Sequence, residues 1–223
     1  HGAGLDDFWN EMMKHRGFAG GFLWSLSDEG AVRTDKGNII DVVGNAAPDG
    51  IVGPHREKEA SYYTIKEIWS PIFINTKTIP QQFNGKIEIE NRYFYTNLHQ
   101  CKFEWKIVAL PKAGSGTGKE KIVQKGMAAS PSLAPGEKGY LNIKYPSNTN
   151  ADALYLTAYD TKGKEIFTWS WALTQPDDIT KQAINIPAQA AITATEKMGG
   201  IEINCDGIVF SFDTTTGFLQ KVF

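Results

Sequence analysis

A short apolar run after two glycines most limits the folds open to this chain. The run Gly20–Leu26 reads Gly-Gly-Phe-Leu-Trp-Ser-Leu, without alternation, and polar residues follow it. An unbroken apolar run of this kind is typical of a parallel strand that is covered on both faces. Parallel strands need neighbours and crossover helices, yet no second strand–helix–strand unit follows. The sequence therefore predicts the end of a larger α/β domain joined to an all-β domain.

Two helices are predicted on either side of this strand and a long loop. Leu5, Phe8 and Trp9 recur at helical spacing, which predicts a helix over residues 5–15. A second helix is expected over residues 57–69, just before a proline. The glycine-dotted loop over 27–56 is long for a compact domain, and such loops are often functional.

From Ile72 onward, the apolar residues recur at a period of two. Alternation such as that of Lys86–Glu90 is typical of antiparallel strands with one solvated face. Turn signals, among them Asn84-Gly85, separate the alternating segments. Seven strands in roughly 100 residues match an immunoglobulin-like sandwich. The strands are expected at 72–79, 86–93, 101–110, 122–129, 138–145, 153–160 and 165–173.

Composition and charge exclude several classes of partner. The formal net charge of −2 argues against nucleic acids and anionic membranes. No apolar run approaches the roughly 20 residues of a membrane-spanning helix. The two cysteines, Cys101 and Cys205, are expected to be buried thiols, although their spacing leaves a disulfide open.

Four motifs, in this order, resemble glycoside hydrolase family 2 of the β-galactosidase type. Gly4–Trp9 resembles the helix that precedes the last barrel strand of the family, and Gly20–Trp24 resembles that strand. Pro48–Val52 resembles a conserved segment that follows it, and Tyr62–Ile72 resembles the helix that closes the barrel. The ordered set is specific, although each motif alone is weak, and it covers about the first third of the chain.

The resemblance implies three parts within a mainly β fold. Residues 1–70 would be the truncated end of a TIM-barrel catalytic domain, made of helix, strand, long loop and helix. A seven-stranded, immunoglobulin-like antiparallel β-sandwich would follow over 71–176. Residues 177–223 would hold a linker, extended over 177–198, and the first strands of a C-terminal β-sheet domain, at 201–203, 208–212 and from residue 218 onward.

The resemblance also implies which chemistry this chain holds. In the family, both catalytic glutamates and the ligands of a divalent metal such as Mg²⁺ lie upstream of this segment. No catalytic residue, metal ligand or cofactor is therefore expected here. The residues expected to bind substrate are Trp24, whose indole would form the apolar floor of a sugar pocket, and Asp49, which would accept sugar hydroxyls or ligate a hard cation.

Each of these residues also has a structural interpretation. Trp24 could be plain core, and Asp49 could be the turn residue of Pro48-Asp49-Gly50. Asp28 is expected to cap a loop rather than to act as an acid or base. A non-proline cis bond often follows the family's tryptophan, and we expect Trp24–Ser25 to lose that geometry without its barrel.

The resulting hypothesis is that the chain is part of a retaining exoglycosidase that hydrolyses terminal β-galactosides. The segment itself would be a spacer domain plus the sugar-stacking edge of the active site, inactive alone. Its partners would be carbohydrate and, within the same protein, the missing barrel and the C-terminal domain. One alternative is a non-catalytic carbohydrate-binding β-sandwich module, in which Trp169 and Trp171 stack on sugar instead of packing in the core. Another is a purely structural immunoglobulin-like domain.

Overall fold

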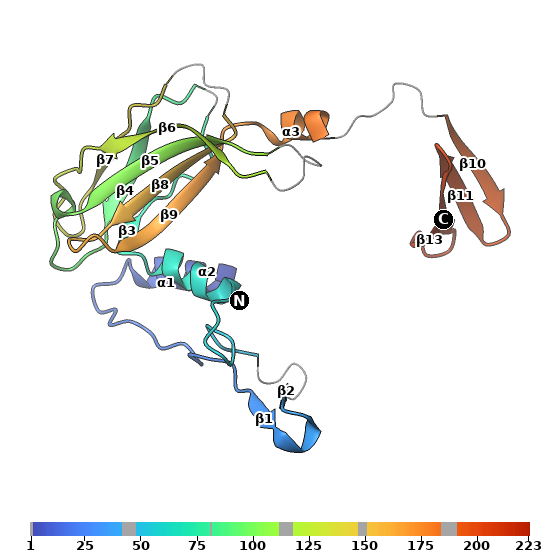
Figure 1. Cartoon of the computed structure of the whole chain (residues 1–223), viewed down its shortest axis with the longest axis horizontal. Coiled ribbons are helices and arrows are strands. Elements are labelled where there is room, and N and C mark those ends of the chain that lie inside the picture. The colour runs from blue at the N-terminus through green and yellow to red at the C-terminus, as the bar shows by residue number, and fades with distance from the viewer. Residues whose placement is uncertain (1, 42–47, 81, 112–117, 147–150, 184–190) are drawn as a thin grey trace. The chain divides into compact units, whose positions relative to one another are not determined.

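The computed structural model describes residues 2–41, 48–80, 82–111, 118–146, 151–183 and 191–223. They belong to two units, residues 1–174 and 175–223, and each unit is considered by itself. Figure 1 traces both units, in which antiparallel sheets dominate and helices are few. The predicted fold class, mainly β with a β-sandwich, is confirmed.

The larger unit contains a sandwich of a three-stranded and a four-stranded sheet. The strand orders are β3-β4-β7 and β6-β5-β8-β9, and all neighbouring strands are antiparallel. All seven predicted strands are present, although the first is shorter than predicted because its pairing with β4 ends at Phe73. The immunoglobulin-like topology stays a prediction. The strands are β3 (Ile72–Phe73), β4 (Lys86–Asn91), β5 (Lys102–Ala109), β6 (Lys121–Ala128), β7 (Lys138–Asn142), β8 (Ala153–Tyr159) and β9 (Glu165–Ala172).

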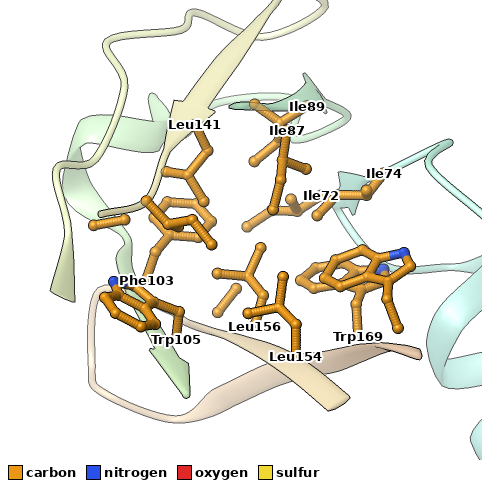
Figure 2. Packing of buried hydrophobic residues seen from close by; sticks show 14 of the residues in the cluster. Ile72, Ile74, Ile87, Ile89, Phe103, Trp105, Leu141, Leu154, Leu156 and Trp169 are labelled. Atoms are coloured by element: carbon orange, nitrogen blue, oxygen red, sulfur yellow. The ribbon is translucent and has the colours of Figure 1, made fainter. Parts of the chain in front are cut away.

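The core of the sandwich follows from the alternation along the strands. In β5, Phe103, Trp105 and Ile107 are buried, whereas Glu104 and Lys106 between them are partly exposed. Residues of the two sheets meet in one apolar cluster, seen from close by in Figure 2. Its labelled members are Ile72, Ile74, Ile87, Ile89, Phe103, Trp105, Leu141, Leu154, Leu156 and Trp169.

Both predicted helices form, with shifted ends. Helix α1 spans Gly2–Met12, so it begins and ends earlier than predicted, and α2 spans Ala60–Ile68. The two helices pack together through Trp9 and Trp69, whose ring centroids lie 5.4 Å apart. Trp69 also ends α2, only three residues before β3 begins, so α2 leads almost directly into the sandwich.

The predicted buried strand around Phe22–Leu26 does not form. The segment is exposed, and among the described residues its backbone pairing is limited to residues 25–28, which bond to 49–52 and form one parallel bridge, Ser27 with Val52. A parallel strand needs hydrogen-bonded neighbours along its length. In the described part of the chain, such a neighbour is present only for residues 25–28, which pair with residues 49–52.

The predicted loop over 27–56 contains a small hairpin that the sequence interpretation missed. Strand β1 (Ala31–Arg33) pairs with β2 (Ile39–Asp41) across the 3₁₀ turn η1 (Thr34–Lys36). Arg33 lies at the centre of this hairpin, with Nη1 2.7 Å from an oxygen of Asp41 and Nη2 2.7 Å from an oxygen of Asp35.

The smaller unit is a helix followed by an antiparallel sheet with the strand order β10-β11-β12-β13. The strands predicted at 201–203, 208–212 and from residue 218 onward are present, but the extended connector predicted over 177–198 is wrong. A helix forms there because a proline begins it and two aspartates occupy its first turn, and β10 forms because it pairs with β11. Residues 184–190 of that connector lie outside the described residues. The elements are α3 (Pro176–Ala183), β10 (Ile192–Lys197), β11 (Gly200–Cys205), β12 (Ile208–Asp213) and β13 (Leu219–Val222).

Both cysteines are free thiols in this structure. Cys101 is buried in the sandwich, and Cys205 is half-buried in the smaller unit. Burial raises the pKa of the Cys101 thiol. Burial, together with the nearby Cys101 and Asp160, raises the pKa of Tyr93 to about 12. This thiol and phenol therefore stay neutral in the folded protein at neutral pH.

The sandwich core predicts the cost of losing a large buried ring. Phe103→Ala removes a fully buried side chain at the centre of the apolar cluster. We expect it to lower the free energy of unfolding by about 3–5 kcal/mol, because a cavity remains. Urea unfolding followed by circular dichroism measures this value. Phe94→Ala is the matched control, since Phe94 is 82% exposed, and its effect should stay within about 0.5 kcal/mol. Equal effects of the two variants would contradict the core assignment.

The raised pKa of Tyr93 predicts a dependence of stability on alkaline pH. The folded state holds the phenol proton more tightly than the unfolded state, whose pKa is near the ordinary value of 10.0. The resulting stability is complete below about pH 10 and is lost as the pH rises through the folded value of about 12. Tyr93→Phe should remove this part of the decline.

Urea midpoints measured at about pH 9 and about pH 11, on either side of the pKa of a free tyrosine, measure this decline. Tyr95→Phe serves as the control because Tyr95 is 96% exposed. The interpretation fails if the Tyr93→Phe variant and the parent chain lose stability equally over this range.

Candidate functional site

Trp24 and Asp49, the two residues predicted to contact sugar, line the same hollow in the larger unit. The walls of the hollow come from helix α1, residues 23–24, residues 48–51 and the first half of α2. The structure thus brings together two residues that are 25 positions apart, and it adds side chains of α1 and α2 to them.

Parallel backbone hydrogen bonds hold the two segments together. Ser25 N donates to the carbonyl of Asp49 (3.3 Å), and Ile51 N donates to the carbonyl of Ser25 (3.0 Å). Val52 N donates to the carbonyl of Leu26 (3.1 Å). This pairing brings the segments of Trp24 and Asp49 together, and both residues line the hollow.

The Trp24–Ser25 peptide bond is cis. The expectation that this bond loses the cis geometry in the present chain is therefore wrong. The backbone after the bond is held locally, because Ser25 pairs with Asp49 and Ile51 and its Oγ donates to the carbonyl of Ser27 (2.8 Å). These contacts come from residues within the chain and need no barrel neighbour.

Asp28 caps the loop beneath the site, as predicted. It is only 9% exposed, and its Oδ1 accepts a hydrogen bond from the backbone N of Gly50 (2.7 Å). A buried carboxylate is costly unless it is hydrogen-bonded, so this contact stabilises the turn after Asp49. Position 50 requires glycine because the two backbone segments lie very close there, and an added Cβ would lie 2.2 Å from the backbone N of Asp28.

The beginning of α2 completes the site with residues that the sequence interpretation missed. Ser61 Oγ donates to the carbonyl of Ile51 (3.0 Å) and so ties the helix to the 48–51 segment. Glu59, at the N-cap of α2, and Thr64 also line the hollow. The helix was predicted, but no sequence signal indicated which of its faces meets Trp24.

The chemistry of the hollow is an exposed aromatic face beside acidic groups. Trp24 is 80% exposed, so it is not part of a core within the described residues. The described lining carries the carboxylates of Asp49 and Glu59 and no lysine, arginine or histidine. An indole face matches the C–H face of a pyranose, and carboxylates accept hydrogen bonds from hydroxyls. The arrangement can bind a sugar ring, and this role stays a prediction for both residues.

Among the described residues, no three His, Cys, Asp or Glu side chains gather as metal ligands would. No described helix is both long and apolar enough to cross a membrane.

The tryptophans of β9 lie in the core and not on the surface. Trp169 and Trp171 are 6% and 5% exposed, and Trp171 Nε1 donates to the carbonyl of Thr76 (2.8 Å). Phe167 packs edge-on against Trp169. The sugar-stacking strip required by the alternative hypothesis is therefore absent from this strand.

Comparison with known proteins relates the sandwich to a hydrolase domain. Residues 87–172, which run from β4 to the end of β9, match the family model of β-galactosidase domain 4. The sandwich is thus related to a domain of glycoside hydrolase family 2. No curated protein gives a significant match.

Two solved structures match this chain at low sequence identity and low TM-score. The exo-chitosanase CsxA of Amycolatopsis orientalis is 15% identical, with a TM-score of 0.37, and the match covers 77% of this chain and 21% of that chain. The β-D-mannosidase of Dictyoglomus thermophilum is 14% identical, with a TM-score of 0.33. This match covers 93% of this chain and 22% of that chain. The chain thus matches about a fifth of the length of each.

The close approach at Gly50 predicts how the site can be disturbed. In Gly50→Ala, the added methyl group would collide with the backbone at Ser27 and Asp28. We expect the pairing of 25–28 with 49–52 to open, with amide exchange at Asp28 and Val52 at least about 10-fold faster, the scale of one lost hydrogen bond. Gly21→Ala is the matched control, since nothing lies within 4 Å of its Cβ position. Unchanged exchange in Gly50→Ala would refute the pairing.

Proposed function

We propose that this chain is part of a retaining exo-acting glycoside hydrolase that resembles β-galactosidase and releases terminal β-galactosides from oligosaccharides. The observation that carries the proposal is the exposed indole of Trp24 beside Asp49, in a unit whose sandwich matches a β-galactosidase domain. In this proposal the immunoglobulin-like sandwich is a spacer domain, and residues 1–70 supply one edge of the active site.

The chemistry of retaining hydrolysis determines which groups we assign to this chain and which to the rest of the longer enzyme. That reaction uses two carboxyl groups about 5–5.5 Å apart, one as nucleophile and one as acid and base. We assign both groups, and the ligands of any divalent metal such as Mg²⁺, to the longer enzyme and none to this chain. Trp24 would orient the sugar by stacking, and Asp49 would accept its hydroxyls. The segment alone is then a binding edge without hydrolase activity.

The exposed apolar side chains near the site support a covering domain in the longer enzyme. Phe22, Trp24 and Leu26 together expose a large apolar surface on one short segment. Contiguous exposed apolar surface marks interaction sites. We infer that the preceding barrel covers Phe22 and Leu26 and leaves Trp24 facing the sugar.

Two assays test this proposal. The chain alone should not hydrolyse 4-nitrophenyl β-galactoside, β-mannoside or β-glucosaminide above background. In the longer enzyme, Trp24→Ala should lower kcat/KM for the β-galactoside by about 10- to 100-fold, because a misplaced substrate costs on the order of 10²-fold. Trp24→Phe, which keeps a flat ring, should lose less.

Phe94→Ala provides the control for the longer enzyme, since Phe94 is an exposed ring of the sandwich that lines no part of the hollow. Unchanged kcat/KM in Trp24→Ala would reject the role of the indole. Turnover by the chain alone, abolished by a substitution within it, would reject the inactive-segment proposal.

A further inference from the structure

One side chain of the sandwich reaches helix α1. Arg92 follows β4 directly, and its Nη1 and Nη2 both donate to Asn10 Oδ1 in α1, at 3.2 Å each. Asn10 is 82 positions away in the sequence. In the described part of the chain, no other hydrogen bond or ion pair joins α1 to the sandwich.

Contacts within the sandwich hold the guanidinium of Arg92 in place, independently of its contact with α1. Arg92 Cζ lies 3.6 Å from the centroid of the Phe73 ring in β3, and Nε donates to Glu90 Oε1 in β4 at 3.4 Å. The backbone N of Arg92 donates to the carbonyl of Pro71 (2.8 Å). The side chain is only 10% exposed. A planar guanidinium stacked in this way presents its remaining donors in a set direction.

A second hydrogen bond links Asn10 to the part of α1 that lines the hollow. Its Nδ2 donates to Asp6 Oδ1 (2.8 Å), one turn closer to the beginning of the helix. Leu5, beside Asp6, lines the hollow that contains Trp24. A shift of α1 would therefore move one wall of the hollow.

Helix α2, in contrast, has two attachments of its own. It continues through Ser70, whose Oγ accepts from Ile72 N (3.2 Å), into β3. Lys66 Nζ lies 2.6 Å from Glu165 Oε1 in β9. Loss of the Arg92 contact should thus loosen α1 while α2 and the sandwich stay in place.

We propose that Arg92 is a positioning residue through which the sandwich sets the place of α1, and with it the Leu5 wall of the hollow. The sandwich is then a support that holds one wall of the site and does more than separate two domains. The direct attachment of α1 to the sandwich rests on the contacts of Arg92, and α1 also packs against α2 through Trp9 and Trp69. Only the last step, from the wall to the sugar, rests on the proposed function.

Hydrogen–deuterium exchange on the chain tests the attachment. Arg92→Ala and Asn10→Ala should each make the amides of α1 exchange about 10-fold faster, the scale of losing one charge-assisted hydrogen bond, while β5 and β8 stay protected. In the double variant α1 should exchange no faster than in Asn10→Ala, because Asn10→Ala already removes the Arg92 contact together with the bond from Asn10 to Asp6.

Arg92→Lys should restore part of the protection. Arg16→Ala, which removes an exposed arginine just after α1, is the matched control.

Asn10→Ala keeps the test decisive even if Arg92→Ala destabilises the sandwich, because Asn10 belongs to the helix alone. Unchanged exchange of α1 in Asn10→Ala, with β5 and β8 protected, overturns the proposal.

In the longer enzyme, Asn10→Ala should raise KM for the β-galactoside several-fold, with a smaller change in kcat and with the thermal midpoint of the sandwich unchanged. Faster exchange of α1 without any kinetic change supports the attachment and overturns its link to the sugar. Absence of glycosidase activity in the unsubstituted longer enzyme would overturn the proposed function, while the exchange result for α1 would stand.

Discussion

Packing between the two sheets of the sandwich is the interaction on which the rest of the larger unit depends. Ile87 and Ile89 of β4 face Leu154 and Leu156 of β8, and all four side chains are completely buried. Burial of such side chains contributes about 1.5–3 kcal/mol each. The core also contains Ile72, so the strand into which α2 leads is anchored in the same cluster.

The candidate site is held by a different kind of interaction. Its two segments are joined by backbone hydrogen bonds and by one buried carboxylate, Asp28, rather than by an apolar core. Hydrogen bonds of this kind each contribute about 0.5–1.5 kcal/mol net. The neighbouring Phe22 and Leu26 remain exposed. Ser61 ties the paired segments to α2, and Arg92 ties α1, which carries Leu5 in the wall of the hollow, to the sandwich.

The smaller unit is a sheet with two unlike faces. The pairing of β11 with β12 sets Ile201 opposite Phe212 and Ile203 opposite Phe210, all on one face and all half-buried. Glu202 and Ser211 pair on the other face. This division agrees with the proposal that these strands open a larger sheet domain in the longer enzyme, because a single sheet buries little of its apolar face by itself.

The sequence by itself determined the elements whose signals are local. The period of two from Ile72 onward and the turn residues between strands predicted every strand of the sandwich, and Asp28 was predicted to cap a loop. Only the tertiary structure decided the elements that need partners. The run Phe22–Leu26 has the composition of a buried strand, yet it forms no strand and its apolar side chains are exposed, because in the described residues only its end at Ser25 and Leu26 finds backbone to pair with. The contact between Arg92 and Asn10 was likewise invisible in the sequence, because no periodicity relates two residues that chain folding alone brings together.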